Sequence, residues 1–222
     1  KSRNMEVDLG ALFESESAHM SSFADDIERI AVRYGEIKQR QCLFDYDDLL
    51  FKLDDLLTNE EHVRTGLNFR YKFVMVDEYQ DTNLVQARLV KHLGGQGMNV
   101  MAVGDDAQSI YAFRGARIEN ILNFPKVFPG AKVIRLEENY RSSQPILDIT
   151  NDLISKAKEK YDKNLFTNRT KGPRPELVRP SSDLTQASAV VSRIVKLAAS
   201  VALHEMAVLF RAGYQSYHLE TE

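Results

Sequence analysis

Hydrophobic and polar residues follow two different periods along this chain, and the periods predict which segments are helices and which are strands. Between residues 18 and 40, apolar side chains recur at spacings of three and four, with charged residues between them. That spacing places the apolar side chains on one face of a helix. Residues 44–57 repeat the pattern, with acidic residues at the beginning, where the helix dipole favours negative charge. Both segments are expected to be amphipathic helices with one packed face.

Short apolar runs that end at acidic residues are the second pattern. The run over 73–77 ends at Asp77 and Glu78, and the run over 99–103 is followed by Gly-Asp-Asp, with a helix expected between them over 82–93. Buried parallel strands are continuous apolar runs, and their carboxyl ends form the edge where α/β proteins bind ligands. The order predicts a strand-helix-strand unit that brings carboxylates to one edge of a parallel sheet.

The alternation of strands and helices is expected to recur after residue 130. Residues 124–130, with the sequence FPKVFPG, contain two prolines and a glycine, which interrupt regular structure and place a domain boundary there. Beyond that boundary we expect strands at 132–136, 176–179 and 206–210, a helix that begins near Ser142 and another that begins at Asp183.

Composition is that of a soluble globular protein inside the cell. The 222 residues with 43% hydrophobic content can bury one large core or two smaller ones. A net charge of −3 means that any nucleic-acid contact must come from a local patch or from stacking. The single Cys42 excludes an intrachain disulfide, and neither a signal segment nor an apolar run of about 18 residues is found. We expect a cytoplasmic protein with no membrane partner.

Asp77 and Glu78 at the end of a strand form the arrangement that a nucleoside triphosphatase needs. The first carboxylate can hold Mg²⁺ through its water shell, and the second can orient or deprotonate the water that attacks the γ-phosphate. For an isolated acidic pair, capping of the helix that begins near Thr82 explains the residues equally well. The motifs that follow separate the two explanations.

Three sequence blocks occur in a fixed order: DEYQDTN at 77–83, GDDAQSIYAFRGA at 104–116 and LEENYRS at 136–142. In this order and spacing, the chain resembles superfamily 1 DNA helicases of the UvrD/Rep type, and the resemblance covers most of its length. It implies an α/β fold of the P-loop NTPase class, in which helices flank a RecA-like parallel sheet.

The resemblance also implies a domain division. Residues 1–43 correspond to the C-terminal part of a helical insertion, 44–130 to part of a first RecA-like motor domain, and 131–222 to the start of a second one.

Nucleotide-binding roles follow from the resemblance for five residues. Asp77 would hold Mg²⁺ and Glu78 would activate water, as their chemistry also suggests. Gln108 would sense the γ-phosphate, a task that suits an amide because it donates and accepts hydrogen bonds without charge. Tyr140 would stack on adenine, and Arg141 would reach the γ-phosphate across the interdomain cleft. ATP and Mg²⁺ are therefore the expected cofactors.

DNA contacts are expected from Tyr111, Phe113 and Arg114. Phe113 stands where the family has a base-stacking aromatic residue, often Trp, and Phe offers a smaller π-face. Packing in the core is the other explanation for Phe113, and Arg114 either contacts DNA or pairs with the region of Glu78. The stretch 156–174 holds seven basic residues, which fit either a solvated loop or a phosphate-tracking surface.

The resulting expectation is an ATP-dependent DNA helicase that moves 3′ to 5′ on single-stranded DNA and unwinds duplexes in repair, replication restart or recombination, together with repair or recombination partners. The chain has no G-x-x-x-x-G-K-[ST] loop and both its ends look cut, so we expect a piece of a longer protein that is inactive alone. One alternative is a non-catalytic single-strand-binding or scaffold module. Another is a Mg²⁺-dependent nuclease that uses a cluster of five acids: Asp77, Glu78, Asp81, Asp105 and Asp106.

Overall fold

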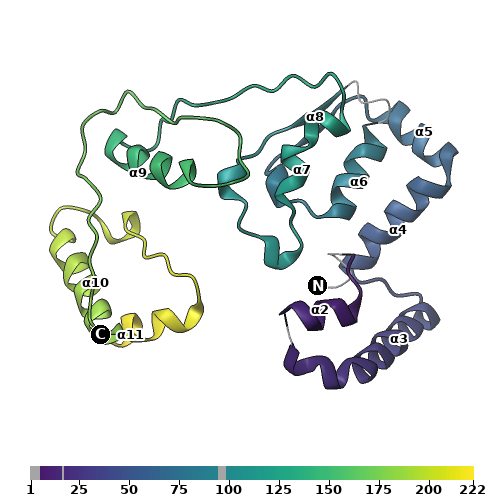
Figure 1. The fold of residues 1–222 in the computed structure, drawn as a ribbon, viewed down its shortest axis with the longest axis horizontal. Coiled ribbons are helices and arrows are strands. Elements are labelled where there is room, and N and C mark those ends of the chain that lie inside the picture. Colours follow the sequence, from purple (N-terminus) through teal and green to yellow (C-terminus); the bar gives the residue numbers. More distant parts are fainter. Residues whose placement is uncertain (1–5, 17, 95–98) are drawn as a thin grey trace. The chain divides into compact units, whose positions relative to one another are not determined.

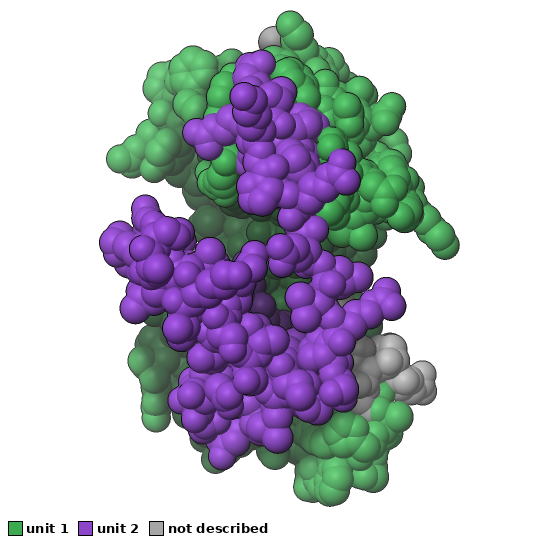
Figure 2. All heavy atoms as spheres, turned by 90° about the vertical axis from the view of Figure 1, so that its left-hand side faces the viewer, with its two compact units in different colours: residues 1–141, 147–167 green, residues 142–146, 168–222 purple. Residues whose placement is uncertain are grey.

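A computed structural model describes residues 6–16, 18–94 and 99–222 of the chain. They divide into two compact units, coloured separately in Figure 2. Unit 1 contains residues 1–141 and 147–167, and unit 2 contains residues 142–146 and 168–222. The domain division expected from the sequence stays a prediction, because units defined by packing need not coincide with family domains.

Most of the secondary structure is helical (Figure 1). The helices that lie wholly in unit 1 are α2 (Leu9–Glu16), α3 (Ala24–Gln41), α4 (Tyr46–Asn59), α5 (Glu61–Arg70), α6 (Leu84–Leu93), α7 (Ile118–Leu122) and α8 (Phe124–Val127), with short 3₁₀ turns η1 (Ala18–Phe23), η2 (Tyr79–Asp81), η3 (Asp106–Gln108) and η4 (Ala112–Arg114). Helix α9 (Gln144–Ser155) begins in unit 2 and continues in unit 1. Unit 2 also contains α10 (Asp183–Leu197), η5 (Leu203–Glu205), η6 (Gly213–Ser216) and α11 (Tyr217–Thr221).

The sheet of unit 1 consists of strands β1 (Val74–Val76) and β2 (Val100–Ala102), which pair in parallel with Val74 opposite Val100. Along both strands the burial alternates, so that one face is partly covered and the other exposes Met75 and Met101. The predicted strand-helix-strand unit is confirmed, with α6 as its helix.

The core of unit 1 lies on the covered face of this sheet. Tyr79 after β1, Val90 of α6, Ile121 of α7 and Phe128 after α8 form a buried cluster. Val76 and the other inward-facing strand residues pack against it. The core therefore fixes the segment directly after β1, where the predicted catalytic acids lie.

The predictions of three further strands are wrong. Residues 132–136, 176–179 and 206–210 form no strand among the residues that the structure describes. A segment becomes a strand only where a neighbour supplies the ladder of hydrogen bonds, and near these segments the described residues form just one isolated parallel bridge, between Glu138 and Phe166. The described residues are mainly helical and contain one small parallel sheet of two strands.

Helices α3 and α4 occupy the positions that the apolar periods predict, but the apolar stripe of α3 is not packed. Ile30 is 67% exposed and Tyr34 is 52% exposed. Instead, Lys38 at the end of α3 holds Asp45 and Asp48 at the beginning of α4, at 2.6 and 2.5 Å. No helix in the described ranges is long and apolar enough to cross a bilayer.

Candidate functional site

The loops that follow the two strands lie against each other. The amide of Val103 donates to the carbonyl of Val76 at 2.8 Å, and the amide of Tyr79 donates to the carbonyl of Val103 at 2.9 Å. These bonds continue the parallel pairing past the ends of β1 and β2. The two acidic loops are therefore neighbours at one edge of the sheet, as the sequence predicts.

Asp77 and Glu78 leave β1 through a sharp turn. Glu78 has φ 50° and ψ 43°, a left-handed conformation that is uncommon for a residue other than glycine and often marks a functional site. The Asp77 carboxylate accepts from the amide of Glu78 at 2.9 Å, and both side chains are exposed. Asn83 caps α6 in a capping box with Gln86, so the capping explanation for the acidic pair is wrong.

The buried side chain of Gln80 connects the two loops. No role for this residue was predicted from the sequence. The residue is only 1% exposed. Its Nε2 donates to Glu78 Oε2 at 2.8 Å, and its Oε1 accepts from the amide of Asp105 at 3.0 Å. Gly104 makes room for it, because a Cβ at that position would lie 2.5 Å from Gln80 Oε1. The signal that the sequence offered is the position of Gln80 inside the DEYQD block.

Gln108 is oriented by Asp105. The Gln108 Nε2 donates to Asp105 Oδ2 at 2.9 Å, and Asp105 Oδ1 accepts from the amide of Ala107. Through Asp105 and Gln80, hydrogen bonds therefore link Gln108 to Glu78. Of the predicted nucleotide-site residues, the structure brings Asp77, Glu78 and Gln108 to one place.

Lys163, from the basic stretch 156–174, neutralises the acidic residues of the loop that follows β2. Lys163 forms ion pairs with Asp105 and, at 2.6 Å, with Asp106. Tyr161 donates its amide to Asp106 Oδ2 at 2.9 Å. Burial raises the pKa of Asp105, but hydrogen bonds from Lys163 and Gln108 outweigh it, so the pKa lies below its usual value. These contacts were not predicted from the sequence.

The nuclease alternative is not supported by the arrangement of the acids. Within the described part of the chain, no group of three or more His, Cys, Asp or Glu residues is placed to hold a metal ion. Asp105 and Asp106 are occupied by Lys163. Burial and the nearby Glu78 raise the pKa of Asp81, which disfavours the charged form that a metal ligand needs. Asp77 is an exposed carboxylate, and its role in holding Mg²⁺ stays a prediction.

The predicted DNA-contact residues lie together at η4, where Tyr111 is half-buried and Phe113 and Arg114 are exposed. Phe113 is 59% exposed, so the core-packing explanation for this ring is wrong. The ring centroids of Tyr111 and Phe113 are 5.9 Å apart. The Arg114 guanidinium lies 5.1 Å and 5.5 Å from these two centroids, so it stacks on the rings. The contact with DNA stays a prediction.

Tyr140 and Arg141 lie in a separate loop of unit 1. Tyr140 is 73% exposed, and its hydroxyl donates to Glu138 at 2.8 Å, which raises the pKa of the phenol. The amide of Arg141 donates to Asn139 Oδ1 at 3.0 Å. An exposed Tyr140 ring is available to stack on a base, but the roles of both residues stay predictions.

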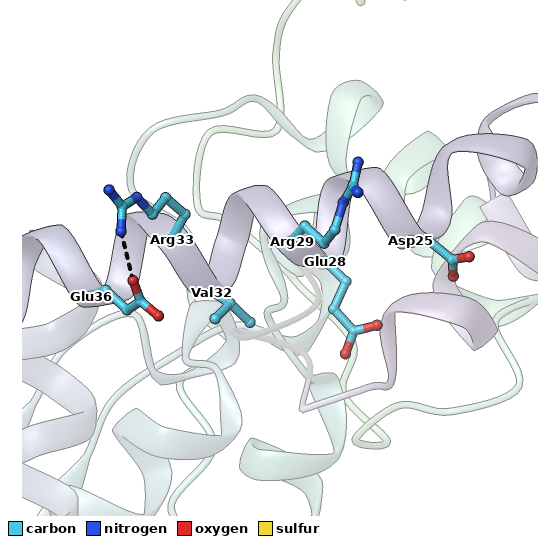
Figure 3. Close-up of a pocket in the computed structure, with 6 residues that line it drawn as sticks. All are labelled: Asp25, Glu28, Arg29, Val32, Arg33 and Glu36. Carbon is cyan, nitrogen blue, oxygen red and sulfur yellow. Dashed lines mark hydrogen bonds and ion pairs between the residues drawn. The ribbon is translucent and has the colours of Figure 1, made fainter.

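A shallow hollow on α3 holds none of the predicted site residues. Figure 3 shows its side chains, which all come from one helix, with Arg33 and Glu36 joined at 2.9 Å. The lining residues are Asp25, Glu28, Arg29, Val32, Arg33 and Glu36. Charges that pair along one exposed helix are typical of a solvated surface.

Comparison with protein families gives two matches in sequence. The family described as UvrD/REP helicase N-terminal domain matches residues 5–129, and the family described as UvrD-like helicase C-terminal domain matches residues 134–222.

Individual relatives agree with the family matches. DNA helicase II of Escherichia coli (strain K12) is 38% identical over 207 residues, which are 91% of this chain and 29% of that protein. The ATP-dependent DNA helicase PcrA of Leuconostoc citreum is 36% identical over 203 residues, 90% of this chain and 27% of that protein. The PcrA of Staphylococcus aureus (strain Mu50) is 38% identical over 182 residues. The chain thus spans less than a third of the length of these relatives.

Proposed function

The chain belongs to the UvrD/REP helicase family, and from this premise we propose that it is part of an ATP-dependent DNA helicase. The enzyme couples ATP hydrolysis to 3′ to 5′ movement on single-stranded DNA and to unwinding of duplexes. Single-stranded and duplex DNA are its substrates, and repair or recombination proteins are its partners in the cytoplasm. The names of the relatives, DNA helicase II and PcrA, support DNA as the substrate class.

The single observation that carries this proposal is the link between the two strand ends. Glu78 and Gln108 come from different loops, and the buried Gln80 together with Asp105 joins them by hydrogen bonds. A catalytic base and a phosphate sensor must keep a fixed separation, because small misplacements are costly in catalysis. A scaffold or single-strand-binding module would need neither this link nor the left-handed backbone at Glu78.

In this proposal Glu78 orients the attacking water and takes up its proton. The left-handed turn and the bond from Gln80 hold the carboxylate beyond the end of β1. Asp77, one residue earlier, would hold Mg²⁺, which when bound neutralises charge on the phosphates. Gln108 has its Nε2 on Asp105, an orientation that leaves its carbonyl oxygen to accept from water.

Tyr140 and Arg141 complete the nucleotide site from the ENYR block. Tyr140 would stack on adenine with its exposed ring. Arg141 would donate to the γ-phosphate, where a planar guanidinium can form two parallel bonds. Binding of ATP would then draw the two motor domains together, and hydrolysis would release them.

Tyr111, Phe113 and Arg114 form the proposed DNA contact. Bases stack on aromatic side chains whatever their sequence, which suits an enzyme that moves along any strand. The short segment from Gln108 to Phe113 connects the phosphate sensor to the aromatic group, because η3 and η4 are separated by only three residues. We also assign the β1-α6-β2 unit to a RecA-like sheet on the basis of family membership.

Glu78→Gln tests the proposal in a full-length helicase that contains these residues. The neutral isostere keeps the bond with Gln80 but cannot take a proton, so DNA-stimulated ATP turnover should fall at least about 100-fold. Binding of a fluorescent ATP analogue should be retained. Glu61→Gln, at an exposed position on α5, is the matched control and should hydrolyse ATP like the wild type. Near wild-type turnover by Glu78→Gln would refute the proposed function.

A further inference from the structure

The segment 161–166 touches two of the motif loops, although it belongs to none of the motif blocks. It lies in unit 1, after α9 and before the chain returns to unit 2 at residue 168. On one side it contacts the loop that carries Gln108, and on the other it contacts the segment just before Tyr140. Each side is held by specific hydrogen bonds.

The contact with the Gln108 loop depends on Lys163. Its ammonium group donates to Asp105 Oδ1 and to Asp106 Oδ1, and the Lys163 side chain is 14% exposed. The Asp106 side chain is only 3% exposed and also accepts from the amide of Tyr161. Asp105 in turn orients Gln108. Lys163 is therefore the cation that holds two adjacent carboxylates together under the phosphate-sensing loop.

The contact with the other motif loop is made by backbone pairing. The amide of Phe166 donates to the carbonyl of Glu137 at 3.0 Å, and the amide of Asn139 donates to the carbonyl of Phe166 at 2.7 Å. The Glu137 carboxylate accepts from the amide of Asn164 at 2.7 Å. Asn139 directly precedes Tyr140 and Arg141 in the sequence. Only two residues separate Lys163 from this pairing at Phe166.

We propose that Lys163 is a positioning residue for ATP hydrolysis, which fixes Gln108 through Asp105 and ties the Gln108 loop to the segment that carries Tyr140 and Arg141. The proposal rests on the proposed function, because it assigns to Lys163, which lies outside the motif blocks, the positioning of the residues that face the γ-phosphate. Lys163 touches neither ATP nor water in this role. Its effect should therefore appear in turnover more than in nucleotide affinity.

Removal of the Lys163 charge has a definite consequence for the loop. Without the ammonium group, the carboxylates of Asp105 and Asp106 would repel each other, and the buried Asp106 would lose its counter-ion. The Asp105 carboxylate would then no longer hold the Gln108 amide in one place. The loop over 104–110 should become more mobile even when no nucleotide is bound.

The test compares Lys163→Met with Lys156→Met in the full-length helicase. Both variants remove one positive charge, but the ion pair that Lys156 forms within the described residues is with exposed Asp152. Lys163→Met should lower kcat for DNA-stimulated ATP hydrolysis about 10-fold or more and change KM for ATP less than about threefold. Lys156→Met should keep the wild-type kcat. Lys163→Arg retains the positive charge and can still donate to both carboxylates, so it should recover most of the turnover.

Amide hydrogen exchange of residues 104–110 supplies a readout that does not depend on hydrolysis. Exchange should be faster in Lys163→Met than in Lys156→Met. If Lys163→Met does not fold, Asp105→Asn replaces it, since that variant leaves Lys163 paired with Asp106, and it should show the same loss of kcat and faster exchange. Wild-type kcat together with unchanged exchange would overturn the positioning role. Glu78→Gln in the same assay judges the proposed function separately.

Discussion

The amide group of Gln80 serves both motif loops at once, because its two ends have opposite hydrogen-bonding character. The Nε2 end donates to a carboxylate on the β1 loop, and the Oε1 end accepts from an amide on the β2 loop. A hydrophobic residue would fit the buried position but would leave the amide of Asp105 without this acceptor. An unsatisfied buried group costs about 1–3 kcal/mol. The position of Gln80 therefore requires a polar side chain, and a side chain of the right volume alone would not suffice.

At the scale of the residue, the exposure of Phe113 distinguishes stacking on a DNA base from packing in the core. Its ring is 59% exposed, so Phe113→Ala should change the free energy of unfolding by less than about 1 kcal/mol. If the ring stacks on a base, the same variant should weaken single-stranded DNA binding by about 1–3 kcal/mol. Chemical denaturation and DNA titration of the full-length helicase measure the two quantities.

Phe69→Ala is the control for Phe113, because Phe69 is also exposed, at 77%, but lies on α5. It should leave DNA binding unchanged. Equal DNA affinity of the wild type and Phe113→Ala would remove Phe113 from the proposed DNA contact.

At the scale of the element, the close approach of β2 and the β1 loop requires glycine at position 104. A Cβ on residue 104 would lie 2.5 Å from Gln80 Oε1 and 2.8 Å from Ile121 Cδ1. Gly104→Ala should therefore destabilise the chain by about 1–3 kcal/mol, as other overpacked sites do. Urea unfolding followed by circular dichroism gives the free energy.

Gly35→Ala is the matched control for Gly104→Ala, since Gly35 lies inside α3 and nothing is within 4 Å of the new Cβ. Because alanine favours the helix over glycine, this variant should gain about 0.5–1 kcal/mol. A Gly104→Ala chain as stable as the wild type would show that Gln80 does not need the close contact.

The helices of the chain could be predicted because their apolar period and caps are local. Helices α4 and α6 begin and end close to the predicted ranges. Helix α3 ends where the pattern predicts but begins only at Ala24, because residues 18–23 form the 3₁₀ turn η1. Strands depend on partners distant in sequence, which explains why the segments at 132–136, 176–179 and 206–210 were predicted wrongly. The helix predicted to begin at Asp183 does begin there as α10, and Ser182 caps it with Thr185.

At the scale of the whole molecule, the motif acids and the strand-end edge could be predicted, whereas the connections between motifs could not. Asp77, Glu78 and Gln108 stand in recognisable blocks, and their meeting follows from parallel strand order. Lys163 stands in a basic stretch with no pattern of its own, 57 residues from Asp106. Contacts of that sequence separation depend on tertiary packing, which single-sequence periods do not encode.

The most direct test of helicase function is unwinding by the full-length helicase of two duplexes that differ only in the polarity of a single-stranded tail. We predict that the 3′-tailed duplex is unwound with ATP and Mg²⁺, that the 5′-tailed duplex is not, and that Glu78→Gln unwinds neither. Unwinding of the 3′-tailed duplex by Glu78→Gln, or strand separation by the wild type without ATP, would contradict it.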